Sequence, residues 1–164
     1  MLARAQRGAI GDPARVPLEQ LVHEALRIEG PEIARLGLVV EDKTTPIQLL
    51  GNETLLARMV ANLVENAVRH NVAGGLVQIS DDARGKMVCL AIANSGVKIE
   101  QSQLSELGEP FRRLGPERVA SGNGAGLGLS IVRAIAEAHG GSLELRARPE
   151  GGLVATVLLP SPAA

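Results

Sequence analysis

The chain has 164 residues, of which 45% are hydrophobic and 21% charged, as is typical of a single globular domain with a substantial core. Its 17 basic and 18 acidic residues give a net charge of −1, which excludes nucleic-acid binding through a strongly positive surface. One phenylalanine, with no tyrosine or tryptophan, excludes a base-stacking platform, and one cysteine excludes an internal disulfide or a cysteine-based zinc cluster.

No membrane span or signal peptide is expected in this sequence. No stretch approaches the roughly 20 apolar residues that a span requires. The opening MLARAQRGAIGDP lacks the apolar run of a signal peptide. We therefore expect a soluble fragment that makes no direct membrane contact.

Gly and Pro residues divide the first part of the chain into short elements. Residues 1–16 contain two glycines and a proline, and are expected to form an irregular lead-in. The run 17–30 has apolar residues at helical spacing and a proline in its first turn, which predicts a helix. Residues 36–42 and 45–51 are typical of short strands.

The middle of the chain predicts a long helix followed by a hairpin. Asn52 is expected to cap a helix over 52–71. Residues 76–82 and 86–96 are strand-like runs separated by the short segment 83–85, and they indicate a β-hairpin. A short helix is expected over 101–107.

The last part predicts a loop, a helix and a closing hairpin. Residues 108–126 show no apolar period and are expected to form a long loop. Its segment 108–123 should be a lid that is mobile without ligand, because it has many glycines and few apolar anchors. A helix over 127–141 then ends at a C-capping glycine, and strands over 142–148 and 152–160 close the domain.

This order of elements predicts an α+β domain. Hairpins dominate over strand–helix–strand units, which favours a two-layer sandwich: a mixed, mostly antiparallel sheet packed on about three helices. The expected organisation is a lead-in over 1–16, one domain over 17–160 and a tail over 161–164.

Polar side chains gather on one face of the predicted helix 52–71. At about 100° per residue, Asn62, Asn66 and Arg69 share one sector, flanked by Glu65 and His70. An amide oxygen can coordinate Mg²⁺, and a guanidinium can pair with phosphate. The alternative is an ordinary solvated helix face.

Four glycines, at positions 122, 124, 126 and 128, alternate directly before the helix in the last part of the chain. Glycines allow the backbone to approach a ligand, and a helix start offers free N–H groups to phosphate. The pattern matches neither the P-loop nor the dinucleotide fingerprint. The alternative is a flexible linker.

Two further segments carry candidate functional residues. Asn94 and Gly96 end a predicted strand, where they indicate either a ligand-binding junction or a simple turn. Phe111 lies in the predicted loop and precedes Arg112 and Arg113. These three residues indicate either a basic lid over an anion or an ordinary loop anchored by its phenylalanine.

Taken in order, these segments resemble a known family. NLVENAVRHN, ANSGVKI, EPFRRL and GNGAGLGLSIVRAIAEAHGG resemble the N, first glycine, F and second glycine boxes of bacterial sensor histidine kinases. The resemblance covers about residues 17–160. It implies the ATP-binding sandwich shared with gyrase, HSP90 and MutL, with ATP and Mg²⁺ as cofactors. It also implies transfer of the γ-phosphoryl group to a histidine.

The resemblance assigns roles to individual residues. It implies that Asn66 binds Mg²⁺ with Asn62 nearby, and that Arg69 meets the phosphates. His70 would lie beside the nucleotide, and Glu65 would help to activate the receiving histidine. Arg113, in the lid, would reach the γ-phosphate. The other residues that it places around the nucleotide are Asn94, Gly96, Lys98, Ile99, Phe111, Arg112, Gly124, Gly126, Leu127, Gly128 and Leu129.

Two residues depart from the family pattern. Asn94 stands where the family usually has an aspartate that accepts a hydrogen bond from the adenine amino group, and Lys98 replaces the second glycine of that box. An amide oxygen can still accept this bond, but it is uncharged and should bind less strongly. We expect adenine recognition to survive in weakened form.

The receiving histidine is expected on another domain. His23 lies in VHEALR, whose spacing does not fit the family's phosphoacceptor motif. The resemblance therefore implies a separate helical phosphoacceptor domain, absent from this chain, and a response regulator downstream. It also implies a cytoplasmic position in a membrane-anchored parent.

Three alternative functions are weighed. ATP hydrolases of the gyrase and MutL kind, and serine kinases of the anti-sigma-factor kind, place a glutamate where this chain has Asn62, so both are disfavoured. A degenerate module that binds a partner without nucleotide stays open because of Asn94 and Lys98.

Overall fold

The computed structural model describes residues 10–100, 102–104 and 125–162. The predicted mobile lid, residues 108–123, lies outside this range. The elements in chain order are β1 (Ala14–Pro17), α2 (Leu18–Ile28), α3 (Gly30–Leu36), β2 (Val39–Lys43), β3 (Gln48–Gly51), α4 (Glu53–Arg69), β4 (Leu76–Arg84), β5 (Met87–Asn94), α7 (Ala125–Ala138), β6 (Ser142–Ala147) and β7 (Leu153–Pro160). Residues 102–104, within the predicted short helix, are helical.

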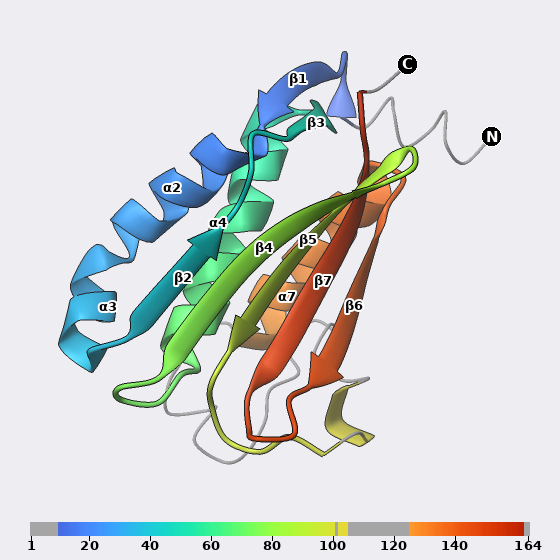
Figure 1. The fold of residues 1–164 in the computed structure, drawn as a ribbon. Helices are drawn as coiled ribbons and strands as arrows, with labels where there is room; N and C mark the ends of the chain where they lie inside the picture. The colour runs from blue at the N-terminus through green and yellow to red at the C-terminus, as the bar shows by residue number, and fades with distance from the viewer. Residues whose placement is uncertain (1–9, 101, 105–124, 163–164) are drawn as a thin grey trace.

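Five strands form one mixed sheet in the order β2-β4-β5-β7-β6. Only the β2–β4 pair of this sheet is parallel, and the other three pairs are antiparallel. Helices α2, α4 and α7 cover one face of the sheet (Figure 1). This arrangement confirms the predicted α+β sandwich.

The N-terminal lead-in is more regular than expected. Residues Ala14–Pro17 form β1, which pairs antiparallel with β3 in a separate two-stranded sheet. The expectation of irregular structure up to residue 16 is therefore wrong for its last three residues. Strand pairing is a non-local interaction, so the glycines and proline before β1 gave no indication of its partner.

The first predicted helix also differs from the structure. Instead of one helix over 17–30, α2 ends at Ile28 and a second helix, α3, begins at Gly30. Pro31 lies in the first turn of α3, where its missing N–H costs no helical hydrogen bond. Gly30 and Pro31 thus start a helix, although glycine and proline more often indicate a turn.

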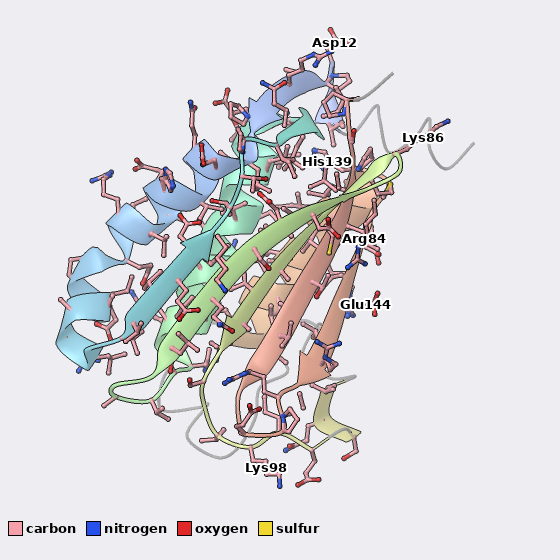
Figure 2. All side chains as sticks on the ribbon, in the orientation of Figure 1. Asp12, Arg84, Lys86, Lys98, His139 and Glu144 are labelled. Atoms are coloured by element: carbon pink, nitrogen blue, oxygen red, sulfur yellow. The ribbon has the colours of Figure 1, made fainter. Side chains whose placement is uncertain are left out.

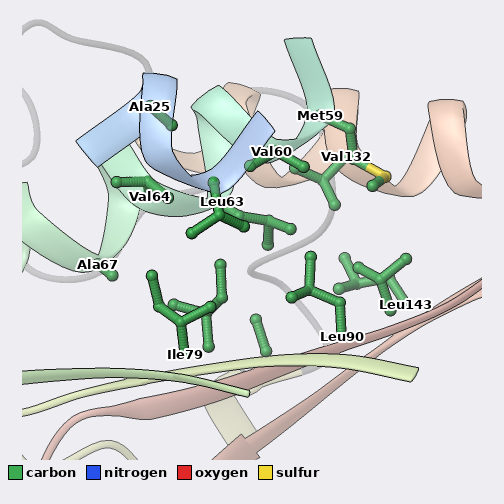
Figure 3. Packing of buried hydrophobic residues seen from close by; sticks show 14 of the residues in the cluster. Ala25, Met59, Val60, Leu63, Val64, Ala67, Ile79, Leu90, Val132 and Leu143 are labelled. Atoms are coloured by element: carbon green, nitrogen blue, oxygen red, sulfur yellow. The ribbon is translucent and has the colours of Figure 1, made fainter. Parts of the chain in front are cut away.

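The core lies between the sheet and the helices (Figure 3). The apolar side chains that recur at helical spacing along α4 are all buried: Leu56, Val60, Leu63, Val64 and Ala67. The predicted cap is confirmed, since Asn52 Oδ1 accepts a hydrogen bond from the Leu55 N–H at 2.9 Å. The free thiol of Cys89 is also buried, and burial raises its pKa. None of the helices in the described ranges has the length and apolarity that crossing a bilayer requires.

Helix α7 begins at Ala125, two residues earlier than predicted. Gly126 and Gly128 therefore lie inside its first turn and not in the preceding loop. The first four N–H groups of an α-helix have no partner within the helix. Residues 125–128 thus hold the positions whose N–H groups have no partner within the helix.

Buried His139 joins the end of α7 to the start of α4. Its Nε2 accepts a hydrogen bond from the Asn52 N–H at 3.1 Å, and its Nδ1 lies 2.8 Å from the Ile135 carbonyl oxygen. These two contacts require a neutral ring that carries its proton on Nδ1. Figure 2 shows His139 at the end of the domain opposite Lys98.

Replacing His139 with leucine should lower the free energy of unfolding by about 2 kcal/mol, because the buried Asn52 N–H would lose its acceptor. Denaturant unfolding of the two proteins measures the change. His23→Leu is the matched control, since the His23 side chain is 59% exposed. Equal stability of the His139 variant and the wild type would contradict this role.

Candidate functional site

The last two turns of α4 carry the polar face predicted from the sequence. Asn62 and Asn66 are half-buried, whereas Glu65 and Arg69 are exposed. His70 follows as the C-cap residue of the helix and is also exposed. The apolar face of the same helix packs in the core, so these five side chains lie on its accessible side.

The start of α7 lies directly against this face. Asn62 Nδ2 donates a hydrogen bond to the Arg58 carbonyl oxygen at 2.9 Å, which turns Oδ1 toward the neighbouring helix. A Cβ atom at Gly128 would lie 3.6 Å from that Oδ1. The amide face of α4 and the first turn of α7 therefore lie side by side.

The end of β5 packs on the C-terminal end of α4. Asn94 is 4% exposed, and its Nδ2 donates to the Ser95 carbonyl oxygen at 2.7 Å. A Cβ atom at Gly96 would lie only 2.8 Å from the His70 carbonyl oxygen. Glycine at position 96 thus lets the backbone after β5 approach the helix end, and it brings Asn94 and His70 to the same region.

The turn between β6 and β7 supports this junction, a role that the sequence did not reveal. The Gly152 N–H donates to the Val97 carbonyl oxygen at 2.9 Å. Arg148 Nη1 donates to the carbonyl oxygens of Asn94 at 3.3 Å and Gly151 at 3.0 Å. In the sequence Arg148 is one more charged residue beside a turn, and no motif indicated its contact with Asn94.

Arg69 has an acidic neighbour that the sequence also did not reveal. Its Nε lies 3.6 Å from Glu29 Oε1, and the Glu29 side chain is only 8% exposed. Burial raises the pKa of Glu29, while the charge of Arg69 opposes that shift. Glu29 separates two helices in the chain, a place where a solvated charge is the ordinary expectation.

His70 favours its neutral form in this environment. Although the residue as a whole is exposed, neighbouring protein atoms partly desolvate the ring and lower its pKa, and the nearby negative charge of Glu65 acts in the opposite direction. A neutral imidazole offers one acceptor nitrogen and one donor. At neutral pH His70 can therefore hydrogen-bond a ligand without adding positive charge.

The remaining candidates differ in what the structure describes. Lys98 is exposed at the end of the domain shown at the bottom of Figure 2. Ile99 packs partly buried against the core, and Leu129 is 1% exposed within it, so that Leu129 would meet a ligand through its backbone. Gly126 and Leu127 lie in α7. Phe111, Arg112, Arg113 and Gly124 lie outside the described residues.

Comparison with known proteins identifies one family. Residues 51–163 match the model of the histidine kinase-, DNA gyrase B-, and HSP90-like ATPase family. The chain is 38% identical over 161 residues to the sensor protein CutS of Streptomyces coelicolor, covering 98% of this chain and 39% of CutS. It is 34% identical over 149 residues to the sensor-like histidine kinase SenX3 of Mycobacterium tuberculosis, covering 89% of this chain and 36% of SenX3.

Solved structures share the fold. The nucleotide-free catalytic domain of histidine kinase ThkA superposes with a TM-score of 0.81 at 23% identity, over 92% of this chain and 97% of that domain. The mycobacterial sensor histidine kinase MprB superposes with a TM-score of 0.77 at 25% identity, over 92% of this chain and 99% of that chain. This chain spans about two fifths of the length of the curated relatives that it matches.

Proposed function

Because the chain belongs to the family of histidine kinase-, DNA gyrase B-, and HSP90-like ATPases, we propose that it is the ATP-binding catalytic domain of a sensor histidine kinase. The proposed domain covers residues 17–160, as the sequence motifs suggest. Its product would be a phosphorylated histidine on a separate helical domain. That histidine would then pass the phosphoryl group to a response regulator. The placement that we propose for it is cytoplasmic, in a membrane-anchored parent.

The observation that carries this proposal is the contact between the two helices of the site. Asn62 Oδ1 faces Gly128 in the first turn of α7, so the amide face of α4 borders N–H groups that have no partner within that helix. Such groups, together with the positive end of the helix dipole, favour a phosphate. A glycine at this point leaves the backbone open to a ligand.

The residues present fit a magnesium ion bound with the phosphates. Asn66 lies one turn after Asn62 on the same half-buried face and supplies an amide oxygen, a ligand type that Mg²⁺ accepts beside water and phosphate. Asn66 would hold the ion. The ion would neutralise phosphate charge during transfer.

The adenine end of the site would lie at Asn94. Its Nδ2 is engaged by the Ser95 carbonyl oxygen, which leaves Oδ1 as the acceptor for an exocyclic amino group. An amide presented in this orientation performs the accepting role for which the family usually employs aspartate. We therefore propose that adenine recognition is retained.

The chain would act mainly by positioning. Arg69 would hold the phosphates, and Arg113 is proposed from the resemblance alone to reach the γ-phosphate. Glu65, exposed on α4, would accept a proton from the incoming histidine as its ring nitrogen bonds to phosphorus. The bond from the γ-phosphorus to the bridging oxygen then breaks, and ADP leaves.

The structure argues against hydrolysis as the main reaction. Asn62 occupies the position of the water-activating glutamate, and an amide does not act as a base at neutral pH. Its Nδ2 is also hydrogen-bonded to the Arg58 carbonyl oxygen. Transfer to a histidine is therefore favoured over transfer to water.

Calorimetric titration with ADP should show binding that is stronger with Mg²⁺ than with EDTA, because Asn66 would hold the ion and the ion would neutralise phosphate charge. GDP serves as the matched ligand, since it has a carbonyl where adenine has its amino group, and it should bind more weakly. A folded sample that does not bind millimolar ADP would overturn the proposal and favour a partner-binding module without nucleotide.

Transfer is tested by mixing the chain with radiolabelled ATP and the helical phosphoacceptor domain of a sensor kinase such as CutS. Label should appear on that domain in an acid-labile, base-stable form, as a phosphohistidine requires. Acid-stable label would instead favour a serine kinase, and release of inorganic phosphate alone would favour a hydrolase.

A further inference from the structure

The α2–α3 junction holds a buried carboxylate that the proposed mechanism does not use. Glu29 is the C-cap residue of α2 and the N-cap residue of α3, so its backbone is fixed between the ends of the two helices. Its side chain is buried, and among the described residues no group hydrogen-bonds its Oε1. An ionised carboxylate removed from water in this way is stabilised by a nearby positive charge.

Arg69 supplies that charge from the last turn of α4. Its Nε lies 3.6 Å from Glu29 Oε1, while 43% of the Arg69 side chain remains exposed. The other charged groups that act on Glu29 are Glu65 and Glu32, and both are negative. Within the described part of the chain, Arg69 is therefore the cation that compensates Glu29.

This pairing restrains the Arg69 side chain, which leaves α4 on the same polar face as Asn62 and Asn66. A free arginine loses considerable rotamer entropy when it binds a ligand, whereas a guanidinium already held by a carboxylate loses less. Arg69 lies three residues after Asn66, so the two side chains leave neighbouring positions on α4. Glu29 thus belongs to a helix junction outside the sequence motifs and yet acts on the site.

We propose that Glu29 is a positioning residue that holds Arg69 in place for the phosphates of the bound nucleotide. This inference rests on the proposed function, because it needs a phosphate ligand beside Arg69. It adds a residue that no sequence motif of the family indicates. It also couples the α2–α3 junction to the nucleotide site through the Glu29–Arg69 ion pair.

The test is competition of ADP with a fluorescent ADP analogue in Mg²⁺, for the wild type, Glu29→Gln, Arg69→Met and the double variant. Glu29→Gln should weaken ADP binding roughly tenfold, the lower end of the effect measured for groups that orient a ligand-binding side chain. The double variant should bind no more weakly than Arg69→Met, because Glu29 acts only through Arg69. Glu29→Asp retains the charge and should restore part of the affinity.

A readout without nucleotide accompanies these titrations. The Nε–H resonance of Arg69 should exchange with solvent more slowly in the wild type than in Glu29→Gln, as expected of an anchored guanidinium. Thermal melting confirms that each variant is folded, and Glu29→Asp covers the case in which glutamine is not tolerated.

The outcomes separate the two proposals. A wild type that does not bind ADP would overturn the proposed function, and this inference with it. A wild type that binds ADP while Glu29→Gln binds it equally well, or more tightly, would overturn the inference alone. An additive loss in the double variant would also overturn it, because Glu29 would then act independently of Arg69.

Discussion

Replacing Asn66 with alanine is expected to abolish the Mg²⁺-dependent part of nucleotide binding. The amide oxygen is the metal ligand that we propose on α4, and alanine offers no replacement. We expect ADP affinity in Mg²⁺ to fall roughly 100-fold, or about 2.7 kcal/mol, to the level that the wild type shows in EDTA. Transfer to the phosphoacceptor domain should become undetectable.

The same substitution should leave the fold intact. Asn66 lies on the accessible face of α4, away from the core, and alanine is the better helix former by roughly 0.7 kcal/mol. The melting temperature should therefore stay the same or rise slightly while binding is lost. Such opposite effects on stability and binding are typical of a residue retained for function.

Thr54→Ala is the matched control for Asn66→Ala. Thr54 is exposed in the first turn of the same helix, far along the axis from Asn66. Calorimetric titration of all three proteins with ADP should show that Thr54→Ala binds like the wild type. Asn66→Ala that keeps its Mg²⁺ dependence would exclude Asn66 as the metal ligand.

Replacing Gly152 with alanine should have the largest effect on stability. The residue adopts φ +96°, a conformation that side chains disfavour, and an added Cβ would overlap the Asn94 carbonyl oxygen. Backbone strain and overpacking together should lower the free energy of unfolding of Gly152→Ala by roughly 2–5 kcal/mol. Because the overlapped atom belongs to Asn94, ADP affinity should fall in the fraction that still folds.

Gly85→Ala separates strain from overlap. Gly85 also has a positive φ, +61°, but an added Cβ would meet no atom within 4 Å. Gly85→Ala should lower the free energy of unfolding by roughly 1–2 kcal/mol from backbone strain alone. It should leave ADP affinity unchanged. Denaturant unfolding measures both variants, and equal losses would show that contact with Asn94 contributes nothing.

Local sequence patterns predicted much of the fold because they report properties of single elements. The apolar period of α4 identified its buried face, and Asn52 identified its start, since both depend on helical spacing and capping alone. Strand-like runs bounded by turn residues located β4, β5, β6 and β7 to within a few residues. The order of these elements was enough to predict the two-layer α+β sandwich.

The patterns failed where an element depends on a distant partner. Strand β1 exists because β3 lies beside it, and nothing in residues 14–17 indicates that pairing. Helix α3 was missed because Gly30 and Pro31 are as typical of turns as of a helix start. For both β1 and α3, the local sequence is compatible with more than one backbone conformation, and contacts with the rest of the fold select the one that forms.

The candidate site shows the same division. By itself, the sequence determined which side chains share the polar face of α4, that glycines lie about the start of a helix, and that Asn94 ends a strand. Only the tertiary structure decided that Gly128 faces Asn62, that Arg148 supports Asn94 and that Glu29 pairs with Arg69. These pairs join residues 40 or more positions apart, and their contact depends on how the helices and hairpins pack. Local periodicity carries no information about such packing, because it describes each element relative to its own axis.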